Sequence, residues 1–158
     1  MIRLEPMTED EFGPFFEASV ARYARENTRS GRWSEDGATS RSRREHEQLL
    51  PQGLRSPDQF LRTVRDAATG ERVGELWFAL RSEDGPKQVW IFWLGIGAPH
   101  RRKGYGAAAL RAVEDEARRL GVDRVGLHVF AHNTGARTLY ERAGFETTNV
   151  VMWKPVPR

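Results

Sequence analysis

The sequence lacks cysteine entirely, and it also lacks any long apolar run. Without cysteine, disulfides, thiolate metal sites and an acyl-cysteine intermediate are excluded, and the chain suits the reducing cytoplasm. A membrane-spanning helix needs about 20 consecutive apolar residues. The opening residues 1–12 (MIRLEPMTEDEF) carry acidic side chains where a secretory signal has a basic start and an apolar stretch. We therefore expect a cytoplasmic protein with no membrane partner.

Internal repeats, low-complexity tracts and linkers are absent as well. The 158 residues match one domain with one hydrophobic core, so we predict a single domain over residues 1–158. The formal net charge is +3, but Arg residues are interspersed with Asp and Glu, which argues against a nucleic-acid partner. His46 is predicted on a helix surface, and its spacing from His100 and His132 is not that of metal ligands, so we expect no metal.

Hydrophobic periodicity and helix-capping patterns predict an α/β fold, a mixed central sheet flanked by helices. Thr8 and Glu11 form a capping box at the start of the first helix. The segment 88–96 (QVWIFWLGI) is almost wholly apolar, as expected for a central strand covered on both faces. The predicted order is β-α-α-β-β-β-α-β-α-β, with strands at 2–5, 60–65, 72–80, 88–96, 124–130 and 145–153 and helices starting at 8, 42, 107 and 134.

The most informative segment is 96–106 (IGAPHRRKGYG), where an apolar strand runs into a basic turn that opens a helix. The exposed N–H groups and the positive end of the helix dipole make such a turn a phosphate site. Gly104 and Gly106 allow the backbone to approach a ligand closely. Positive charge comes from three successive side chains, Arg101, Arg102 and Lys103. The pattern predicts a site for a pyrophosphate.

Other interpretations of this turn remain. The basic side chains can be solvent charges, with the glycines merely shaping the turn. Gly104, Gly106 and Ala109 also match the G-x-G-x-x-A pattern of dinucleotide sites. That pattern, however, places the glycines directly after the strand and an acidic residue at the end of the next strand, where this chain has Val129 and Phe130. A P-loop is excluded because no G-x-x-x-x-G-K-[ST] sequence occurs.

Two segments carry a family resemblance. Residues 101–106 (RRKGYG) resemble the [QR]-x-x-G-x-[GA] motif of the GNAT superfamily of acetyl-CoA-dependent N-acetyltransferases. Residues 133–145 (NTGARTLYERAGF) are similar to that family's second signature, N-x-x-A-x-x-L-Y-x-x-x-G-F, at the expected distance. The resemblance covers about 72–145. The sequence departs from the family pattern at Ala98, where many members have a proline. In this chain the proline is the next residue, Pro99. We therefore expect a slightly altered start of the loop.

The resemblance implies the GNAT fold and acetyl-CoA as cosubstrate. It implies that the amides of the turn bind the CoA pyrophosphate and that the backbone of Ile96 pairs with the pantetheine arm. Asn133 would contact this arm from the other side, and it also suits the role of a helix cap. Gly95 and Gly97 are compatible with a bulge beside Ile96 or with an ordinary strand end. The predicted cofactor-binding set is Ile96, Arg101, Arg102, Lys103, Gly104, Tyr105, Gly106, Ala107 and Asn133.

Acyl transfer to an amine needs a neutral amine and an acid for the departing thiolate. By the resemblance, Tyr140 matches the signature tyrosine that protonates the CoA sulfur, and a phenol stays protonated until that thiolate forms. The alternative is a core aromatic. His128, predicted in mid-strand, is the candidate base because imidazole titrates near neutrality. The rival interpretation is that His128 is a structural histidine. A water relay through backbone carbonyls would then take the place of a dedicated base.

The predicted function is that of an N-acetyltransferase that moves acetyl from acetyl-CoA to a primary amine by direct transfer in a ternary complex. The alternative is a non-catalytic CoA-binding sensor or interaction domain of the same fold. The acceptor amine, on a small molecule or a peptide, is left open, and the resemblance places acceptor specificity around residues 23–33. A homodimer is expected from the resemblance alone.

Overall fold

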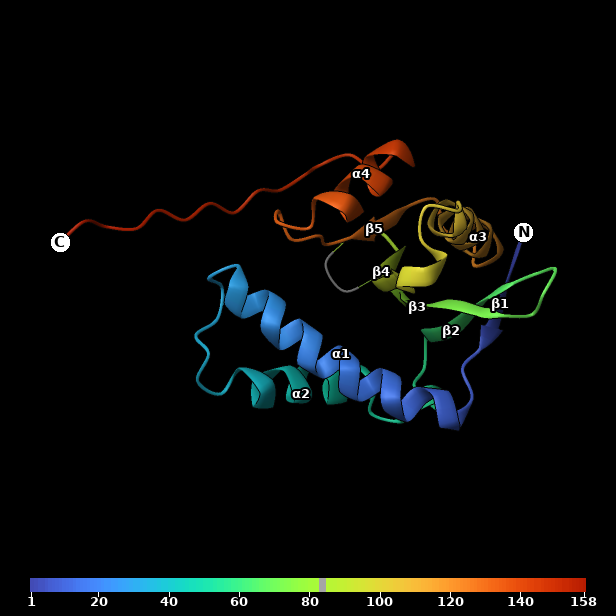
Figure 1. Ribbon diagram of the computed structural model, residues 1–158, viewed down its shortest axis with the longest axis horizontal. Helices are drawn as coiled ribbons and strands as arrows, with labels where there is room; N and C mark the ends of the chain where they lie inside the picture. Colours follow the sequence, from blue (N-terminus) through green and yellow to red (C-terminus); the bar gives the residue numbers. More distant parts are fainter. Residues whose placement is uncertain (83–84) are drawn as a thin grey trace.

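The sheet has five strands in the order β1-β2-β3-β4-β5 in a computed structural model that describes residues 1–82 and 85–158 (Figure 1). Neighbours from β1 to β4 pair antiparallel, and β5 pairs parallel to β4. The strands are β1 (Ile2–Pro6), β2 (Gln59–Asp66), β3 (Arg72–Arg81), β4 (Gln88–Ile96) and β5 (Val125–Leu127). The helices are α1 (Glu9–Arg29), α2 (Ala38–Leu49), α3 (Tyr105–Arg119) and α4 (Thr134–Arg142), with 3-10 turns at Gly53–Arg55 and Ala98–His100.

Helices cover both faces of the sheet, with α1 and α2 on one side and α3 and α4 on the other (Figure 1). Alternation along β3 shows how the sequence achieves this. Leu76 and Phe78 join the core beneath α3, whereas Trp77 between them joins the core beneath α1 and α2. Side chains of a strand alternate between faces, so a strand buried on both faces needs apolar residues at successive positions. The apolar run of β4 has the same cause, since Val89 and Ile91 join the core beneath α3 and Phe92 and Trp93 pack against the other core. β4 is covered on both faces as predicted, but it is the fourth of the five strands and not the middle one.

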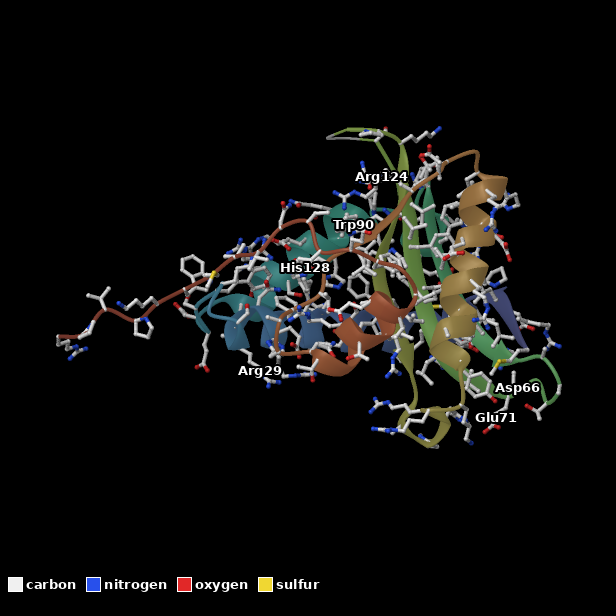
Figure 2. All side chains as sticks on the ribbon, turned by 90° about the horizontal axis from the view of Figure 1, so that it is seen from above. Arg29, Asp66, Glu71, Trp90, Arg124 and His128 are labelled. Atoms are coloured by element: carbon white, nitrogen blue, oxygen red, sulfur yellow. The ribbon has the colours of Figure 1, made fainter. Side chains whose placement is uncertain are left out.

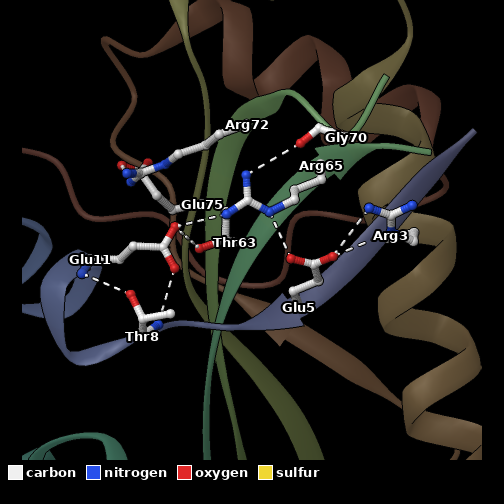
Figure 3. Close-up of polar contacts among 9 residues, drawn as sticks. All are labelled: Arg3, Glu5, Thr8, Glu11, Thr63, Arg65, Gly70, Arg72 and Glu75. Carbon is white, nitrogen blue, oxygen red and sulfur yellow. Dashed lines mark hydrogen bonds and ion pairs between the residues drawn. The ribbon is translucent and has the colours of Figure 1, made fainter. Parts of the chain in front are cut away.

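The predicted capping box opens α1. The N–H of Glu11 donates to Thr8 Oγ1 at 3.2 Å, and the Thr8 N–H donates to Glu11 Oε1 at 3.0 Å. The Glu11 carboxylate also accepts hydrogen bonds from Thr63 and Arg65 of β2 (Figure 3). Burial would raise the pKa of Glu11, but the hydrogen bonds from Thr8 and Thr63 and the charge of Arg65 outweigh it and lower this pKa. Local capping and a tertiary contact thus hold the start of α1 on the sheet.

Two predictions about the end of the chain need correction. The strand predicted at 124–130 is shorter, because β5 ends at Leu127. The final strand predicted at 145–153 is absent, since residues 146–158 have no regular structure and run away from the sheet (Figure 1). A strand needs a neighbour for its N–H and C=O groups, and no residue among 1–82 and 85–158 bonds to the backbone of this segment. The fold class and the order up to α4 are confirmed.

His46 is buried instead of lying on a helix surface. Its Nδ1–H donates to the Ser42 carbonyl at 2.8 Å, and its Nε2 lies 2.9 Å from Ser19 Oγ, which can donate to it. Both ring nitrogens are therefore satisfied in the neutral form. Burial, followed by the charge of Arg22, lowers the pKa of His46, although the Ser42 carbonyl opposes the shift. His46 is a structural histidine that joins α2 to α1.

The burial of His46 makes stability depend on pH. In the unfolded chain its pKa is near 6.5, so on acidification the unfolded state binds the proton first and the free energy of unfolding falls. This contribution is fully present above about pH 6.5 and is lost as the pH falls toward the lower pKa of the folded state. Urea unfolding of wild type and His46→Gln at a series of pH values should show a weaker acid dependence in the variant. Equal slopes would contradict the assignment.

No helix among residues 1–82 and 85–158 is long and apolar enough to cross a membrane.

Candidate active site

The strands β4 and β5 pair only over a short stretch. Val89 to Ile91 of β4 lie beside Val125 to Leu127 of β5, and the pairing stops there. β4 continues to Ile96, whereas the chain after Leu127 leaves the sheet. On the β5 side, the backbone of β4 from Phe92 to Ile96 therefore has no neighbouring strand among the described residues. An extended ligand can occupy that strand position, beside Ile96 as the sequence predicts.

An irregularity in β4 lies at Phe92. Trp77 of β3 pairs with Trp93, but Phe78 pairs with Ile91, so Phe92 is an extra residue that forms a bulge. The register around Gly95 is regular, so of the two interpretations that the sequence left open, a bulge beside Ile96 or an ordinary strand end, the structure shows the strand end. Gly95 has another reason to lack a side chain, since a Cβ atom would lie 2.4 Å from the Trp93 ring. The bulge thus coincides with the point where β5 departs.

The turn before α3 presents a row of unused amides. Arg102 and Gly104 both have positive φ angles, of 61° and 86°. The N–H groups from Arg102 to Ala107 make no hydrogen bond with any described residue. The first turn of α3 also holds no acidic side chain that would compete for them. Successive free amides at a helix N-terminus form a concave anion site, which is the geometry expected for a pyrophosphate.

The side chains of this turn have different roles. The Tyr105 hydroxyl donates to Asp66 Oδ2 at 2.6 Å, a bond that raises the pKa of Tyr105 and is the main cause lowering the pKa of Asp66 to about 2. The side chain of Tyr105 therefore anchors α3 to the end of β2, where Asp66 lies near Glu71 (Figure 2). Arg101 Nε donates to the Ile96 carbonyl at 3.0 Å, which ties the turn to the end of β4. Arg102 and Lys103 are exposed.

Gly106 serves the packing of two helices as well as the anion site. A Cβ atom at this position would lie 3.0 Å from Leu139 Cδ2, tighter than ordinary contact. The small residue therefore lets α4 approach the first turn of α3. As a result, the helix that carries Tyr140 is placed directly against the helix that carries the anion site.

Tyr140 lies on α4 and packs against the core on the α3 side of the sheet. Its ring contacts Phe145 with the centroids 5.7 Å apart. Burial raises the pKa of Tyr140. The hydroxyl makes no hydrogen bond with any described residue. The phenol is therefore protonated at neutral pH and can donate to a ligand.

His128 is the first residue after β5, and the prediction that it lies in mid-strand is wrong (Figure 2). Its ring meets Phe130 edge-on at 4.7 Å between centroids. The side chain keeps an exposed surface, but desolvation of its protein-facing side, followed by the charge of Arg32, lowers the pKa of His128. Imidazole is therefore neutral at pH 7 and able to accept a proton. Arg32 belongs to the loop after α1, so His128 faces the α1 side.

Asn133 caps α4, because its Oδ1 accepts a hydrogen bond from the Ala136 N–H at 3.3 Å. This is the capping role that the sequence predicted. Nearby, the imidazole of His132 is hydrogen-bonded to the carboxylate of Glu26 of α1, which ties the loop between β5 and α4 across to α1. The loop that carries His128 is thereby held at both ends.

A cluster beside the end of β4 was missed from the sequence. Trp93 Nε1 donates to Glu75 Oε2 at 3.4 Å, and the guanidinium of Arg22 lies 3.3 Å from the centroid of the Trp93 ring. Desolvation is the main cause that lowers the pKa of Arg22 to about 10. The available signal was a single Glu within the otherwise apolar residues 73–80 (VGELWFAL). The cluster adds charged groups to the α1 side, next to the part of β4 that lacks a neighbour.

Comparison with known proteins agrees with this geometry. Residues 20–145 match the Acetyltransferase (GNAT) family. The uncharacterized N-acetyltransferases YycN and YdgE of Bacillus subtilis (strain 168) are each 37% identical to the chain, over 153 residues (97% of each chain) and 151 residues (96% of each chain) respectively. The crystal structure of YycN superposes with a TM-score of 0.91 at 36% identity and covers 100% of both chains.

The match to this family identifies the protein as an acyl-group transferase. The chain belongs to the GNAT family of acetyltransferases and is an N-acetyltransferase. The family typically uses acetyl-CoA, and its activity implies an amine acceptor.

Proposed function

We propose that this protein transfers acetyl from acetyl-CoA directly to a primary amine in a ternary complex. The observation that carries the proposal is the row of free amides from Arg102 to Ala107. This row follows the end of β4, where β4 no longer pairs with β5. The amides bind the pyrophosphate, with Arg101, Arg102 and Lys103 supplying positive charge. The pantetheine arm lies along β4 near Ile96, with the side-chain amide of Asn133 on its other side.

Tyr140 and His128 are proposed as acid and base. The amine nitrogen attacks the thioester carbonyl carbon, the C–S bond breaks, and the hydroxyl of Tyr140 protonates the leaving sulfur. His128 accepts the proton that the amine loses. Tyr140 packs on the α3 side of the sheet and His128 faces the α1 side, which supports separate roles for the two groups. The shifts of both pKa values favour the protonated phenol and the neutral imidazole that these roles need.

The rival function is CoA binding without turnover, and one experiment separates the two. A thermal-shift screen of CoA esters should show stabilisation by acetyl-CoA, because a ligand that binds the native state raises its apparent stability. Release of free CoA thiol is then measured with a panel of small amines and peptides. Stabilisation together with amine-dependent thiol release supports the enzyme. Stabilisation without release from any amine supports the sensor, and no stabilisation contradicts both.

His128→Ala is expected to remove the acidic inflection from the pH profile of turnover and to lower turnover about tenfold, since water can take over part of a base's role. In wild type this inflection should lie below about pH 6.5, because burial and Arg32 lower the pKa of His128. The affinity for acetyl-CoA, measured by calorimetry, should not change.

Arg32→Gln provides the matched test. Removing a positive charge makes protonation of His128 easier, so the inflection should move to higher pH while turnover at pH 8 stays similar. If the pH profile of turnover were unchanged in both variants, water or another side chain, and not His128, would be the group that accepts the proton of the amine.

A further inference from the structure

The guanidinium of Arg22 stacks on an aromatic ring but makes no hydrogen bond or ion pair within the described chain. Its Cζ atom lies 3.3 Å from the centroid of the Trp93 ring, so the planar group lies against the face of the indole. The side chain of Arg22 is half-buried. A guanidinium carries five N–H donors in one plane, and stacking leaves their outward directions open. The donors of Arg22 therefore need an acceptor from outside the described chain.

The carboxylates near Arg22 are bound by other groups. Desolvation lowers the pKa of Arg22 to about 10, although the charges of Glu75 and Glu26 oppose the shift. Arg72 Nη2 donates to Glu75 Oε1 at 3.1 Å (Figure 3). The carboxylate of Glu26 is hydrogen-bonded to His132. Both carboxylates thus act on the guanidinium only from a distance, and neither serves as the acceptor for its N–H groups.

Other arginines near this end of α1 lack this combination. Arg25 and Arg29 are exposed, so water satisfies their N–H groups. The guanidinium of Arg32 donates to Asn27 Oδ1 at 2.9 Å. A half-buried charged donor without an acceptor is costly, because it has lost part of its water and gained no partner. A bound carboxylate would give Arg22 both the missing acceptors and an opposite charge.

Arg22 lies on the side of the sheet from which an acceptor amine meets the proposed base. Arg22 and Glu26 are four residues apart on α1 and so share a face of that helix. Glu26 contacts His132, in the loop that also carries His128. Trp93, on which the guanidinium stacks, packs against the core beneath α1 and α2. This face of α1 is therefore turned toward both the unpaired part of β4 and the loop of His128.

We propose that Arg22 binds a carboxylate of the acceptor, so that the acceptor is a small amine that carries a carboxylate, such as an amino acid. The inference rests on the proposed acetyl transfer and adds the class of acceptor. The fork of N–H groups fits a carboxylate through two parallel hydrogen bonds. Stacking on Trp93 already fixes the fork, so little freedom is lost on binding. Acetyl-CoA and the amino acid become the N-acetyl amino acid and free CoA thiol, and the carboxylate is unchanged.

Pairs of amines that differ only in the carboxylate test the proposal on the wild-type protein. Thiol release is measured with α-, β- and γ-amino acids and with the carboxamide of each. At least one acid should have a kcat/KM about 10- to 100-fold above that of its amide, as expected for a bidentate bond between charged groups. Amidation lowers the pKa of the neighbouring amine and leaves more of it neutral, so basicity cannot produce this preference.

The outcomes of this panel separate the carboxylate anchor from the acetyl transfer. Equal rates within every pair, or faster release with the amides, would overturn the anchor and leave the acetyl transfer in place. Absence of release from every amine would contradict the acetyl transfer and the anchor together.

Arg22→Gln should raise the KM of the preferred amino acid about 10- to 100-fold with little change in kcat, because a bond remote from the reacting atoms is equally strong in the ground state and the transition state. The KM of the matching amide should not change. Arg22→Lys should restore only part of the affinity, since an ammonium group has no fork. Stabilisation by acetyl-CoA in a thermal-shift assay should match wild type in both variants.

Arg25→Gln is the matched control, since it removes the same charge from an exposed position on the same helix. This variant should keep the wild-type KM for the acid and for the amide. An equal rise in KM in Arg25→Gln and Arg22→Gln would indicate general attraction by a basic surface. Loss of turnover with acid and amide alike in Arg22→Gln would show that Arg22 only supports the packing of Trp93. Either result, or an unchanged preference for the acid in Arg22→Gln, would overturn the proposal.

Discussion

Tyr140→Phe is expected to lower turnover by about 10- to 1000-fold, around the range for losing a positioned acid, while the fold and the affinity for acetyl-CoA are kept. The ring carries the packing against Phe145 and the core, and Phe retains it. The hydroxyl makes no hydrogen bond within the described chain, so its removal leaves no internal group unpaired. Only the proton donor is therefore tested, by thiol-release kinetics at saturating acetyl-CoA.

A series of acyl donors provides the control for Tyr140→Phe. A more acidic thiol leaves without help from an acid, so the difference between wild type and variant should shrink along the series. A difference that stays constant would indicate a positioning effect of the hydroxyl on the substrate. Wild-type turnover in the Phe variant would remove Tyr140 from the mechanism and leave it as a core aromatic.

Gly104→Val is expected to weaken acetyl-CoA binding by about 10- to 100-fold. Gly104 has a φ of 86° at the start of α3, and holding a non-glycine residue there costs about 1–3 kcal/mol. A β-branched residue relieves that strain by changing the backbone of the turn, which takes the free amides out of line with the pyrophosphate. Calorimetry with acetyl-CoA measures the loss. Space is not the cause, because the nearest atom to a Cβ would be Met1 Cε at 3.5 Å.

Gly121→Val is the matched control, at the other end of the same helix. Gly121 has a φ of 76°, and no atom lies within 4 Å of where its Cβ would be. The variant should lose a similar amount of stability in urea unfolding yet bind acetyl-CoA like wild type. An equal loss of affinity in both variants would show a general effect of destabilisation. Gly106→Val is a poorer test of the anion site than Gly104→Val, since it also pushes Leu139 of α4.

Local patterns in the sequence determined much of this protein. The capping box at Thr8 and the apolar run of β4 predicted their elements because each signal depends on residues a few positions apart. The turn at 101–106 predicted an amide-lined anion site for the same reason, since glycines and a following helix act through local backbone geometry. The family followed from two short signatures, and the comparisons confirmed it.

Tertiary structure alone decided the features that depend on contacts between distant segments. His46 is buried because Ser19, on another helix, satisfies its second ring nitrogen. Glu75 of β3 accepts a hydrogen bond from the indole of Trp93 on the neighbouring strand β4. The strand that the sequence predicts at 145–153 is absent from the structure. Whether a strand forms depends on a neighbouring edge, which no local pattern specifies, and no described residue bonds to the backbone of residues 146–158.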